Sequence, residues 1–303
     1  MSSSKPQNRT SITLHKYLLI ALSFSGLVGC NVGTTQHQEV IRWEEHTKLP
    51  DPEGLSGSYT GVSNGTLIIA GGVKFTTDIR KDGLGKMWSD AIYALPKTSK
   101  KNETWITGAR LPRSLAYGAS VSTGDSLIII GGRDSDRSYK DVFRLRWNPT
   151  IQKIEQESLP PLPAAVAYTD ADIIGDIIYI AGGQDVANSQ KALKIFWTLD
   201  LNDLESGWIE LDPWPGVAPK NAIAFSQNIS RDTYFYLIGG EKLKNEKDSE
   251  IKSNLLSDGY RYSPFKNQWD SIKTAPSSIT AVPHIAFGQS HLIVFGGSFE
   301  KEL

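Results

Sequence analysis

The chain has 303 residues, of which 39% are hydrophobic, 10% aromatic and 21% charged, and its formal net charge is -1. This composition is that of an ordinary globular protein with enough length for a large core, which excludes a disordered chain. The near-zero net charge and the scatter of lysines and arginines among acidic residues exclude a nucleic-acid partner.

The first residues have the pattern of an export signal. Lys5, Arg9 and Lys16 form a positive region without acidic residues, and the apolar run YLLIALSFSGLVG (17–29) follows it. Because this run is too short for a stable membrane span, we predict that residues 1–29 form a signal peptide.

Cys30, the only cysteine of the chain, directly follows this run. The ending LVGC resembles the lipobox of bacterial lipoproteins, in which the cysteine becomes the lipid-modified first residue of the mature protein. Residues 30–42 would then form the lipidated cysteine and a polar tether, and Asn31 implies the outer membrane. We therefore expect a protein anchored by lipid on the periplasmic side of the bacterial outer membrane, or a soluble periplasmic one. A buried structural cysteine is the alternative.

A short apolar run followed by two glycines recurs along the rest of the chain. The copies are LIIAGG (67–72), LIIIGG (127–132), IYIAGG (178–183), FYLIGG (235–240) and LIVFGG (292–297). Intervals of 60, 51, 57 and 57 residues separate the second glycines, which indicates one repeated supersecondary unit. Each run is typical of a buried strand that closes a hairpin, and the glycines permit close backbone approach or positive φ.

Each unit continues with an aromatic strand and a final strand. We expect the aromatic strands at 90–95, 141–145, 194–199 and 259–262. The final strands are expected around Trp105, Ile154, Trp208 and Trp269. Four short strands in roughly fifty residues predict one blade of a β-propeller. Residues 43–303 are therefore predicted to be all-β, with about five blades and the last one incomplete, and Trp43 is expected in an outer strand that closes the ring.

The diglycine with a spaced tyrosine and tryptophan resembles the kelch repeat. Longer stretches, among them LPDPEGLSGSYTGVSNGTLIIAGGVKF, KMWSDAIYALPK and LPRSLAYGASVSTGDSLIIIGG, resemble the N-acetylneuraminate epimerases, or sialic acid mutarotases, in their cyclically permuted bacterial form. The resemblance implies an exported, six-bladed kelch propeller. It also implies an isomerase that interconverts the α and β anomers of N-acetylneuraminate by acid/base catalysis.

One departure from this family concerns its catalytic motif. In the family the acid/base glutamate and a nearby arginine lie in a motif G-E-x-K-P-G-x-R, which the order of blades places after LIVFGG, where this sequence ends. Six blades of roughly 56 residues each also need more chain than residues 43–303. We therefore expect a C-terminally truncated chain, with the family's glutamate in the missing blade. The alternatives to a mutarotase are a non-catalytic propeller that binds a glycan or a protein, and an inactive remnant.

Mutarotation needs groups that exchange protons with the anomeric hydroxyl and the ring oxygen, and a cation for the substrate carboxylate. In a propeller such groups should follow the diglycines or precede the inner strands. By this rule Glu241 and Arg113 are the catalytic candidates, since the arginine fork suits a carboxylate. The substrate-binding candidates are Tyr59, Lys74, Tyr117, Asn221 and His284. Packing or simple surface exposure is the alternative for each.

No cofactor or metal is expected. His284 and His291 lack neighbouring cysteines and the H-E-x-x-H spacing, which disfavours a zinc site. Because the only cysteine is expected to carry the lipid, the mature chain lacks the free cysteine that copper radical chemistry like that of galactose oxidase needs. No G-x-G-x-x-G motif opens a helix. The partner that the family resemblance implies is sialic acid, and membrane contact is expected only through the lipid anchor.

Overall fold

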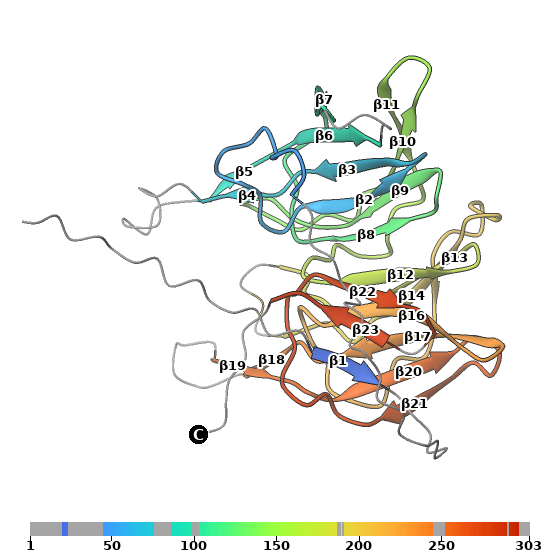
Figure 1. Cartoon of the computed structure of the whole chain (residues 1–303). Helices are drawn as coiled ribbons and strands as arrows, with labels where there is room; N and C mark the ends of the chain where they lie inside the picture. Colours follow the sequence, from blue (N-terminus) through green and yellow to red (C-terminus); the bar gives the residue numbers. More distant parts are fainter. Residues whose placement is uncertain are drawn as a thin grey trace, which may run out of the picture.

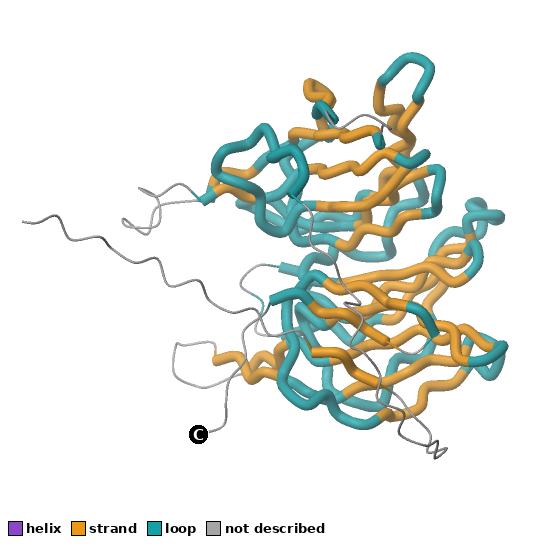
Figure 2. The backbone as a smooth tube through the Cα atoms, viewed as in Figure 1, coloured by secondary structure: helices purple, strands orange, loops and turns teal. Residues whose placement is uncertain are grey.

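A computed structural model of the chain describes residues 20–23, 45–75, 86–97, 103–186, 189, 191–244, 252–289 and 291–296. These residues form strands, turns and loops (Figures 1 and 2), which confirms the all-β prediction. In this part of the chain, no helix has the length and apolar character needed to cross a bilayer.

Four antiparallel sheets of four strands follow one another along the chain, and we call them blades 1 to 4. Blade 1 contains β2 (Tyr59–Ser63), β3 (Thr66–Ala70), β6 (Ala91–Pro96) and β7 (Ile106–Arg110). Blade 2 contains β8 (Ala119–Ser122), β9 (Ser126–Ile130), β10 (Val142–Asn148) and β11 (Lys153–Ser158). Blade 3 contains β12 (Asp170–Ile174), β13 (Ile177–Ala181), β14 (Phe196–Asp200) and β15 (Ile209–Glu210). Blade 4 contains β16 (Ile223–Ile229), β17 (Asp232–Ile238), β20 (Gly259–Ser263) and β21 (Gln268–Ile272). In each blade the predicted diglycine directly follows the second strand.

A fifth sheet, blade 5, contains β22 (His284–Phe287), β23 (His291–Val294) and β1 (Ile20–Ser23). β1 pairs antiparallel with β23, at the position that the third strand holds in the other blades. This strand lies inside the predicted signal peptide, so cleavage before Cys30 would remove it from the sheet. The rest of that signal peptide, Cys30, the tether and Trp43 lie outside the described residues.

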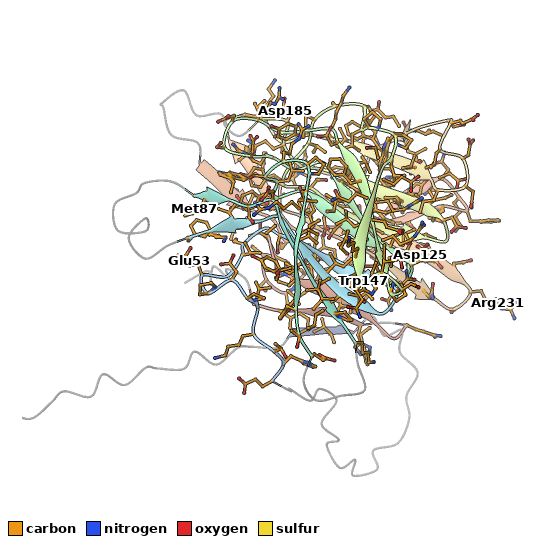
Figure 3. All side chains as sticks on the ribbon, turned by 90° about the horizontal axis from the view of Figure 1, so that it is seen from above. Glu53, Met87, Asp125, Trp147, Asp185 and Arg231 are labelled. Carbon is orange, nitrogen blue, oxygen red and sulfur yellow. The ribbon has the colours of Figure 1, made fainter. Side chains whose placement is uncertain are left out.

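Two small strand pairs extend the blades beyond their diglycines. They are β4 (Val73–Lys74) with β5 (Met87–Trp88), and β18 (Glu241–Lys244) with β19 (Lys252–Leu255). Both pairs lie on the same side of the molecule, at the left of Figure 1. In Figure 3, Met87 lies on the opposite side from Asp125, which belongs to the turn between β8 and β9. We call the diglycine side of the propeller the mouth.

The hydrophobic core lies between successive blades. The innermost strands β2, β8, β12, β16 and β22 contact one another in that order. Leu127 packs between blades 1 and 2, Ile178 between 2 and 3, Phe235 between 3 and 4, and Leu292 between 4 and 5. Blade 2 is covered on both faces, so its second strand β9 is buried along its whole length, whereas β3 of blade 1 alternates between buried and half-buried residues.

Side chains of one innermost strand accept hydrogen bonds from backbone N–H groups of the innermost strand in the neighbouring blade. An innermost strand has only one neighbour in its own sheet, so its other edge needs different partners. The Ser122 hydroxyl accepts a hydrogen bond from the Val62 N–H at 2.9 Å, and the Asp170 carboxylate accepts one from the Ala224 N–H at 2.8 Å. These contacts join neighbouring blades around the axis.

The predicted tryptophans anchor the loops that precede each blade. The indole N–H of Trp208 donates to the carbonyl of Pro160 at 2.8 Å, and that of Trp269 donates to the carbonyl of Asp212 at 3.0 Å. Trp269 lies in a fourth strand, as predicted, whereas Trp105 and Trp208 each stand one residue before theirs. The predicted positions of the final strands are thus confirmed to within a residue.

Candidate functional site

Backbone hydrogen bonds link the blades at the mouth. The N–H of Tyr117 donates to the carbonyl of Gly57 at 2.9 Å, that of Tyr168 to Tyr117 at 2.6 Å, that of Asn221 to Tyr168 at 2.7 Å, and that of Ala281 to Asn221 at 3.0 Å. These five residues each precede an inner strand, and their φ angles lie between 49° and 62°. Positive φ is uncommon for residues other than glycine and concentrates at functional sites. Tyr117, Tyr168 and Asn221 therefore lie in sequence around the mouth.

The residues that directly follow the diglycines form a second equivalent set. Each makes a bridge to the residue that precedes one of the positive-φ positions. In blades 1 to 4 this set is Val73, Arg133, Gln184 and Glu241. Arg133 and Glu241 thus occupy the same place in two different blades, and both are at the mouth.

Glu241 has a fixed carboxylate. Its Oε1 accepts hydrogen bonds from Nδ2 of Asn221 and from the hydroxyl of Thr280, both at 3.1 Å. Its Oε2 lies 3.5 Å from Nζ of Lys220, and the side chain is 16% exposed. The carboxylate is therefore held by three neighbours while still reachable from the mouth.

Aromatic rings and cations lie beside this carboxylate. The rings of Tyr117 and Tyr168 stack with their centroids 5.1 Å apart, and Trp88 meets Tyr117 edge-on at 5.7 Å. Nζ of Lys86 lies 4.9 Å from the centre of the Tyr117 ring and 3.2 Å from its hydroxyl oxygen. Nζ of Lys220 lies 5.6 Å from the centre of the Tyr168 ring. The tyrosine pair is therefore flanked by positive charge.

Arg133 completes the group. It is only 8% exposed, its Nη1 lies 3.3 Å from the Tyr168 hydroxyl, and its guanidinium lies 5.4 Å from the centre of the Trp88 ring. We use the name mouth cluster for Lys86, Trp88, Tyr117, Arg133, Tyr168, Lys220, Asn221, Glu241 and Thr280. The cluster combines a carboxylate, three cations and three partly exposed aromatic rings, which suits an anionic polar ligand.

Three of the candidates from the sequence lie together in the mouth cluster. Glu241 and Asn221 are hydrogen-bonded to each other, and Tyr117 is joined to Asn221 through the backbone of Tyr168. Their roles in substrate binding and catalysis stay predictions.

Two candidates lie in structural positions instead. Tyr59 is 1% exposed and its hydroxyl donates to the carbonyl of Gly131 at 2.8 Å, and burial raises its pKa. Nζ of Lys74 pairs with the buried Asp51 at 2.5 Å, and this hydrogen bond raises the pKa of Lys74. The structure therefore gives both side chains internal partners away from the mouth cluster.

Arg113 contacts the segment that precedes β10 rather than the mouth cluster. Its Nη1 lies 3.4 Å from the carboxylate of Asp141, and its guanidinium lies 4.5 Å from the centre of the Tyr139 ring. The cation that faces the mouth cluster from blade 2 is Arg133, not Arg113.

His284 lies at the junction of three inner strands. Its Nε2 is 2.9 Å from the carbonyl of Ala224 and 3.5 Å from the carboxylate of Asp170. Burial raises the pKa of Asp170, and the neighbouring His284 opposes that effect. His284 thus joins blades 3, 4 and 5 and is not brought into the mouth cluster.

Two residues of the mouth cluster, Arg133 and Tyr168, were not among the candidates, although their positions in the repeat match those of two candidates. Arg133 follows Gly132 just as Glu241 follows Gly240, and Tyr168 in VAYT stands where Tyr117 stands in LAYG. Lys86 and Trp88 had no such signal, because they lie at β5, a short strand that is not part of the repeat.

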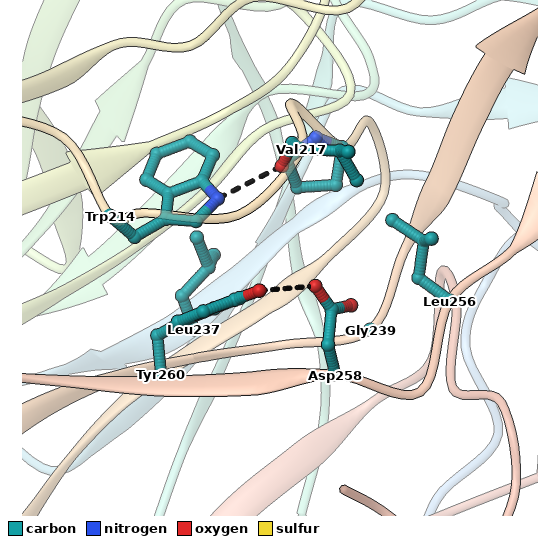
Figure 4. Close-up of a pocket in the computed structure, with 8 residues that line it drawn as sticks. Trp214, Val217, Leu237, Gly239, Leu256, Asp258 and Tyr260 are labelled. Atoms are coloured by element: carbon teal, nitrogen blue, oxygen red, sulfur yellow. Dashed lines mark hydrogen bonds between the residues drawn. The ribbon is translucent and has the colours of Figure 1, made fainter. Parts of the chain in front are cut away.

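Two small hollows in the structure do not coincide with the mouth cluster. Figure 4 shows one of them, a packing crevice in which Trp214 donates to the carbonyl of Val217 and the Tyr260 hydroxyl donates to Asp258. The other, of about 70 Å³, lies between blades 4 and 5 and is too small for a sugar. Neither is lined by a residue of the mouth cluster.

The chain was compared with protein families and with curated proteins. The model of a family described as N-acetylneuraminate epimerase matches residues 25–154 and 159–303. The chain is 32% identical over 129 residues to an N-acetylneuraminate epimerase of Brucella suis, which covers 37% of this chain and 32% of that protein. It is 35% identical over 128 residues to the Vibrio cholerae protein of the same name, which covers 37% and 33%. The chain spans about a third of the length of the curated relatives it matches.

A solved structure has a similar fold. The protein in "Structure of YjhT" superposes with a TM-score of 0.55 at 15% sequence identity, over 79% of this chain and 71% of the other. Together with the strand order of the blades, this similarity confirms the predicted kelch-type β-propeller. The number of blades in the complete ring stays a prediction.

Proposed function

Because the chain belongs to the N-acetylneuraminate epimerase family, we propose that it interconverts the α and β anomers of N-acetylneuraminate. The observation that carries this proposal is the carboxylate of Glu241, which is held at the mouth by Asn221, Thr280 and Lys220. Nζ of Lys220 lies 3.5 Å from this carboxylate and 5.6 Å from the centre of the Tyr168 ring, so Lys220 links Glu241 to the stacked tyrosines.

Anomer exchange requires only proton transfers. The sugar ring opens when a proton leaves the anomeric hydroxyl and a proton reaches the ring oxygen, and it closes on either face of the resulting ketone by the reverse steps. In the proposed site Oε2 of Glu241 takes the hydroxyl proton, and the carboxylic acid so formed gives a proton to the ring oxygen. Closure on the other face reverses both transfers and leaves Glu241 as the carboxylate. No proton, electron or atom is gained or lost overall, so no co-substrate is needed.

Glu241 lies in a different blade from the family's glutamate, because the order of blades places the family motif G-E-x-K-P-G-x-R after LIVFGG (292–297). Gly240 and Glu241 match only the first two positions of that motif, and Leu243, Lys244 and Asn245 stand at its lysine, proline and glycine positions. Glu241 is therefore proposed on its contacts at the mouth and not on the motif.

The tyrosine pair offers a binding platform. Tyr117 and Tyr168 are only partly buried, so the ring atoms that their stacking, Lys86 and Lys220 leave open can pack against the C–H face of a sugar. Both residues have positive φ, and the Tyr168 N–H donates to the Tyr117 carbonyl.

Substitution of Glu241 tests the proposal. We expect Glu241→Gln to reduce the anomer exchange rate by about 100-fold or more, since general acid/base groups contribute factors of this size. Two-dimensional exchange NMR of N-acetylneuraminate at equilibrium measures the rate. Glu205→Gln, at an exposed glutamate of blade 3, is the control and should exchange at the unsubstituted rate. A Glu241→Gln variant as fast as the control would remove Glu241 from the mechanism.

The proposed location follows from the N-terminal sequence. We propose that Cys30 is lipid-modified and anchors the protein in a bacterial outer membrane, facing the periplasm. Cys30→Ser should move the protein from the membrane fraction to the soluble fraction on cell fractionation. Equal membrane recovery for both forms would contradict the lipid anchor.

A further inference from the structure

Arg133 is a buried cation without an acidic partner. Among the described residues it is the only arginine that is buried, with 8% of its surface exposed, and no carboxylate lies within ion-pair distance of it. Its protein contacts are neutral: Nε donates to the carbonyl of Asp134 at 2.9 Å, Nη2 to the carbonyl of Ser135 at 3.2 Å, and Nη1 to the Tyr168 hydroxyl at 3.3 Å.

Two other described cations on the mouth side of the propeller have acidic partners, since Lys74 pairs with Asp51 and Lys220 pairs with Glu241. Lys86 has no acidic partner among the described residues either, but it is exposed to water, whereas Arg133 is buried. A guanidinium removed from water without a counter-charge is costly, and the cost is offset when an anion binds to it. The absence of an acidic partner at Arg133 therefore points to an anion supplied by a ligand.

The surroundings of Arg133 select the kind of anion. The two carbonyl contacts and the Trp88 ring fix the plane of the guanidinium, and a planar fork of this kind binds both oxygens of a carboxylate. The Tyr168 oxygen accepts from Arg133, so its own proton is free to donate to the same ligand. A second cation, Lys86, lies on the other tyrosine of the stacked pair.

We propose that Arg133 binds the carboxylate of an acidic sugar and makes the site specific for the acid over its neutral forms. This inference rests on the proposed function and deepens it. In N-acetylneuraminate the anomeric carbon carries both the carboxylate and the hydroxyl that changes face. Arg133 thus orients the reacting carbon between blade 2 and Glu241 of blade 4, with the sugar over Tyr117 and Tyr168.

Binding measurements on the full chain test this role without turnover. N-acetylneuraminate and its methyl ester, which lacks the negative charge, are titrated separately by saturation-transfer NMR. We expect the acid to bind at least about tenfold more tightly than the ester. In Arg133→Gln this preference should fall to about one, mainly through weaker binding of the acid, and Arg133→Lys should restore part of it.

A control variant and two possible results decide whether Arg133 has this role. Arg231, which is exposed and projects from the edge of the molecule in Figure 3, provides Arg231→Gln, which should keep the full preference. A folded Arg133→Gln variant that still prefers the acid would overturn the inference. If Arg133→Gln does not fold, Arg133→Lys decides, because lysine keeps the charge but loses the fork, and an unchanged preference would again overturn it.

The two proposals can fail separately. A chain that binds the acid through Arg133 but does not accelerate anomer exchange would contradict the proposed function alone. A chain that accelerates exchange with an unchanged acid preference in Arg133→Gln would contradict only the role of Arg133.

Discussion

Gly132 shows at the scale of one residue why the diglycines recur. Its φ is 100°, and a Cβ atom at this position would meet the hydroxyl of Tyr59 and the carbonyl of Ala116. The same tyrosine donates its hydroxyl proton to the carbonyl of Gly131. The second glycine of the pair is therefore required both by the backbone conformation and by the close approach of the next inner strand.

Substitution of Gly132 and of Gly124 separates the effect of positive φ from the effect of the close approach. We expect Gly132→Ala to lower the free energy of unfolding by about 3 kcal/mol or more, because strain from positive φ adds to the clash. Gly124 has a φ of 90° and open space around it, so Gly124→Ala should cost only about 1–2 kcal/mol. Urea unfolding of the two variants gives both values, and equal losses would show that the close approach has no effect.

The residues of the site could be predicted in part. The rule that functional groups follow the diglycines gave Glu241, and applied to every repeat it also gives Arg133. It could not exclude Arg113, because the pairing of Arg113 with Asp141 depends on how the loop before β8 folds against β10. Nothing in the sequence around Tyr59 marks this residue as buried. Only the packing of blade 2 against it shows that its hydroxyl is internal.

At the scale of elements, packing between blades is sensitive to ionisation. Tyr179 of β13 is 4% exposed and packs between blades 3 and 4, with its ring centroid 5.8 Å from Phe196 and 5.6 Å from Phe235. Burial, with the nearby Tyr262, raises the pKa of Tyr179 to about 12. A phenolate cannot be accommodated there at low cost.

The sign of this shift predicts loss of stability in alkali. The folded pKa of Tyr179 is above the unfolded value of 10.0, so its contribution is complete below pH 10 and is lost as the pH rises through about 12. Tyr179→Phe should remove about 2 kcal/mol of that loss at pH 12 while changing stability little at pH 7. Urea unfolding of both forms at the two pH values measures the difference. Parallel losses in the two forms would contradict the assignment.

The strands of the blades could be predicted because burial and the repeat act on the same residues. Each apolar run packs against at least one neighbouring blade, and the period repeats this pattern independently of the loops. The pairs β4–β5 and β18–β19 could not be predicted, since they contain two to four residues each and arise where a loop folds back on itself. Nor could β1, because its partner β23 is at the far end of the chain.

At the scale of the whole molecule, the site depends on the order of the blades. Arg133 comes from blade 2, Tyr168 from the approach to blade 3, and Glu241 from blade 4, so no single blade contains the site. The backbone hydrogen bonds from Gly57 through Tyr117, Tyr168 and Asn221 to Ala281 set the spacing of these groups. The repeat predicted this architecture, whereas the number of blades in the closed ring stays a prediction.

The central claim is that this propeller accelerates the anomer exchange of N-acetylneuraminate. The most direct measurement releases the α anomer with a sialidase and follows its conversion to the β anomer by proton NMR, with and without catalytic amounts of the full chain. We expect the α signal to decay faster in proportion to the amount of chain added, and we expect Glu241→Gln to abolish the acceleration. Decay at the spontaneous rate at every concentration of the folded chain would contradict it.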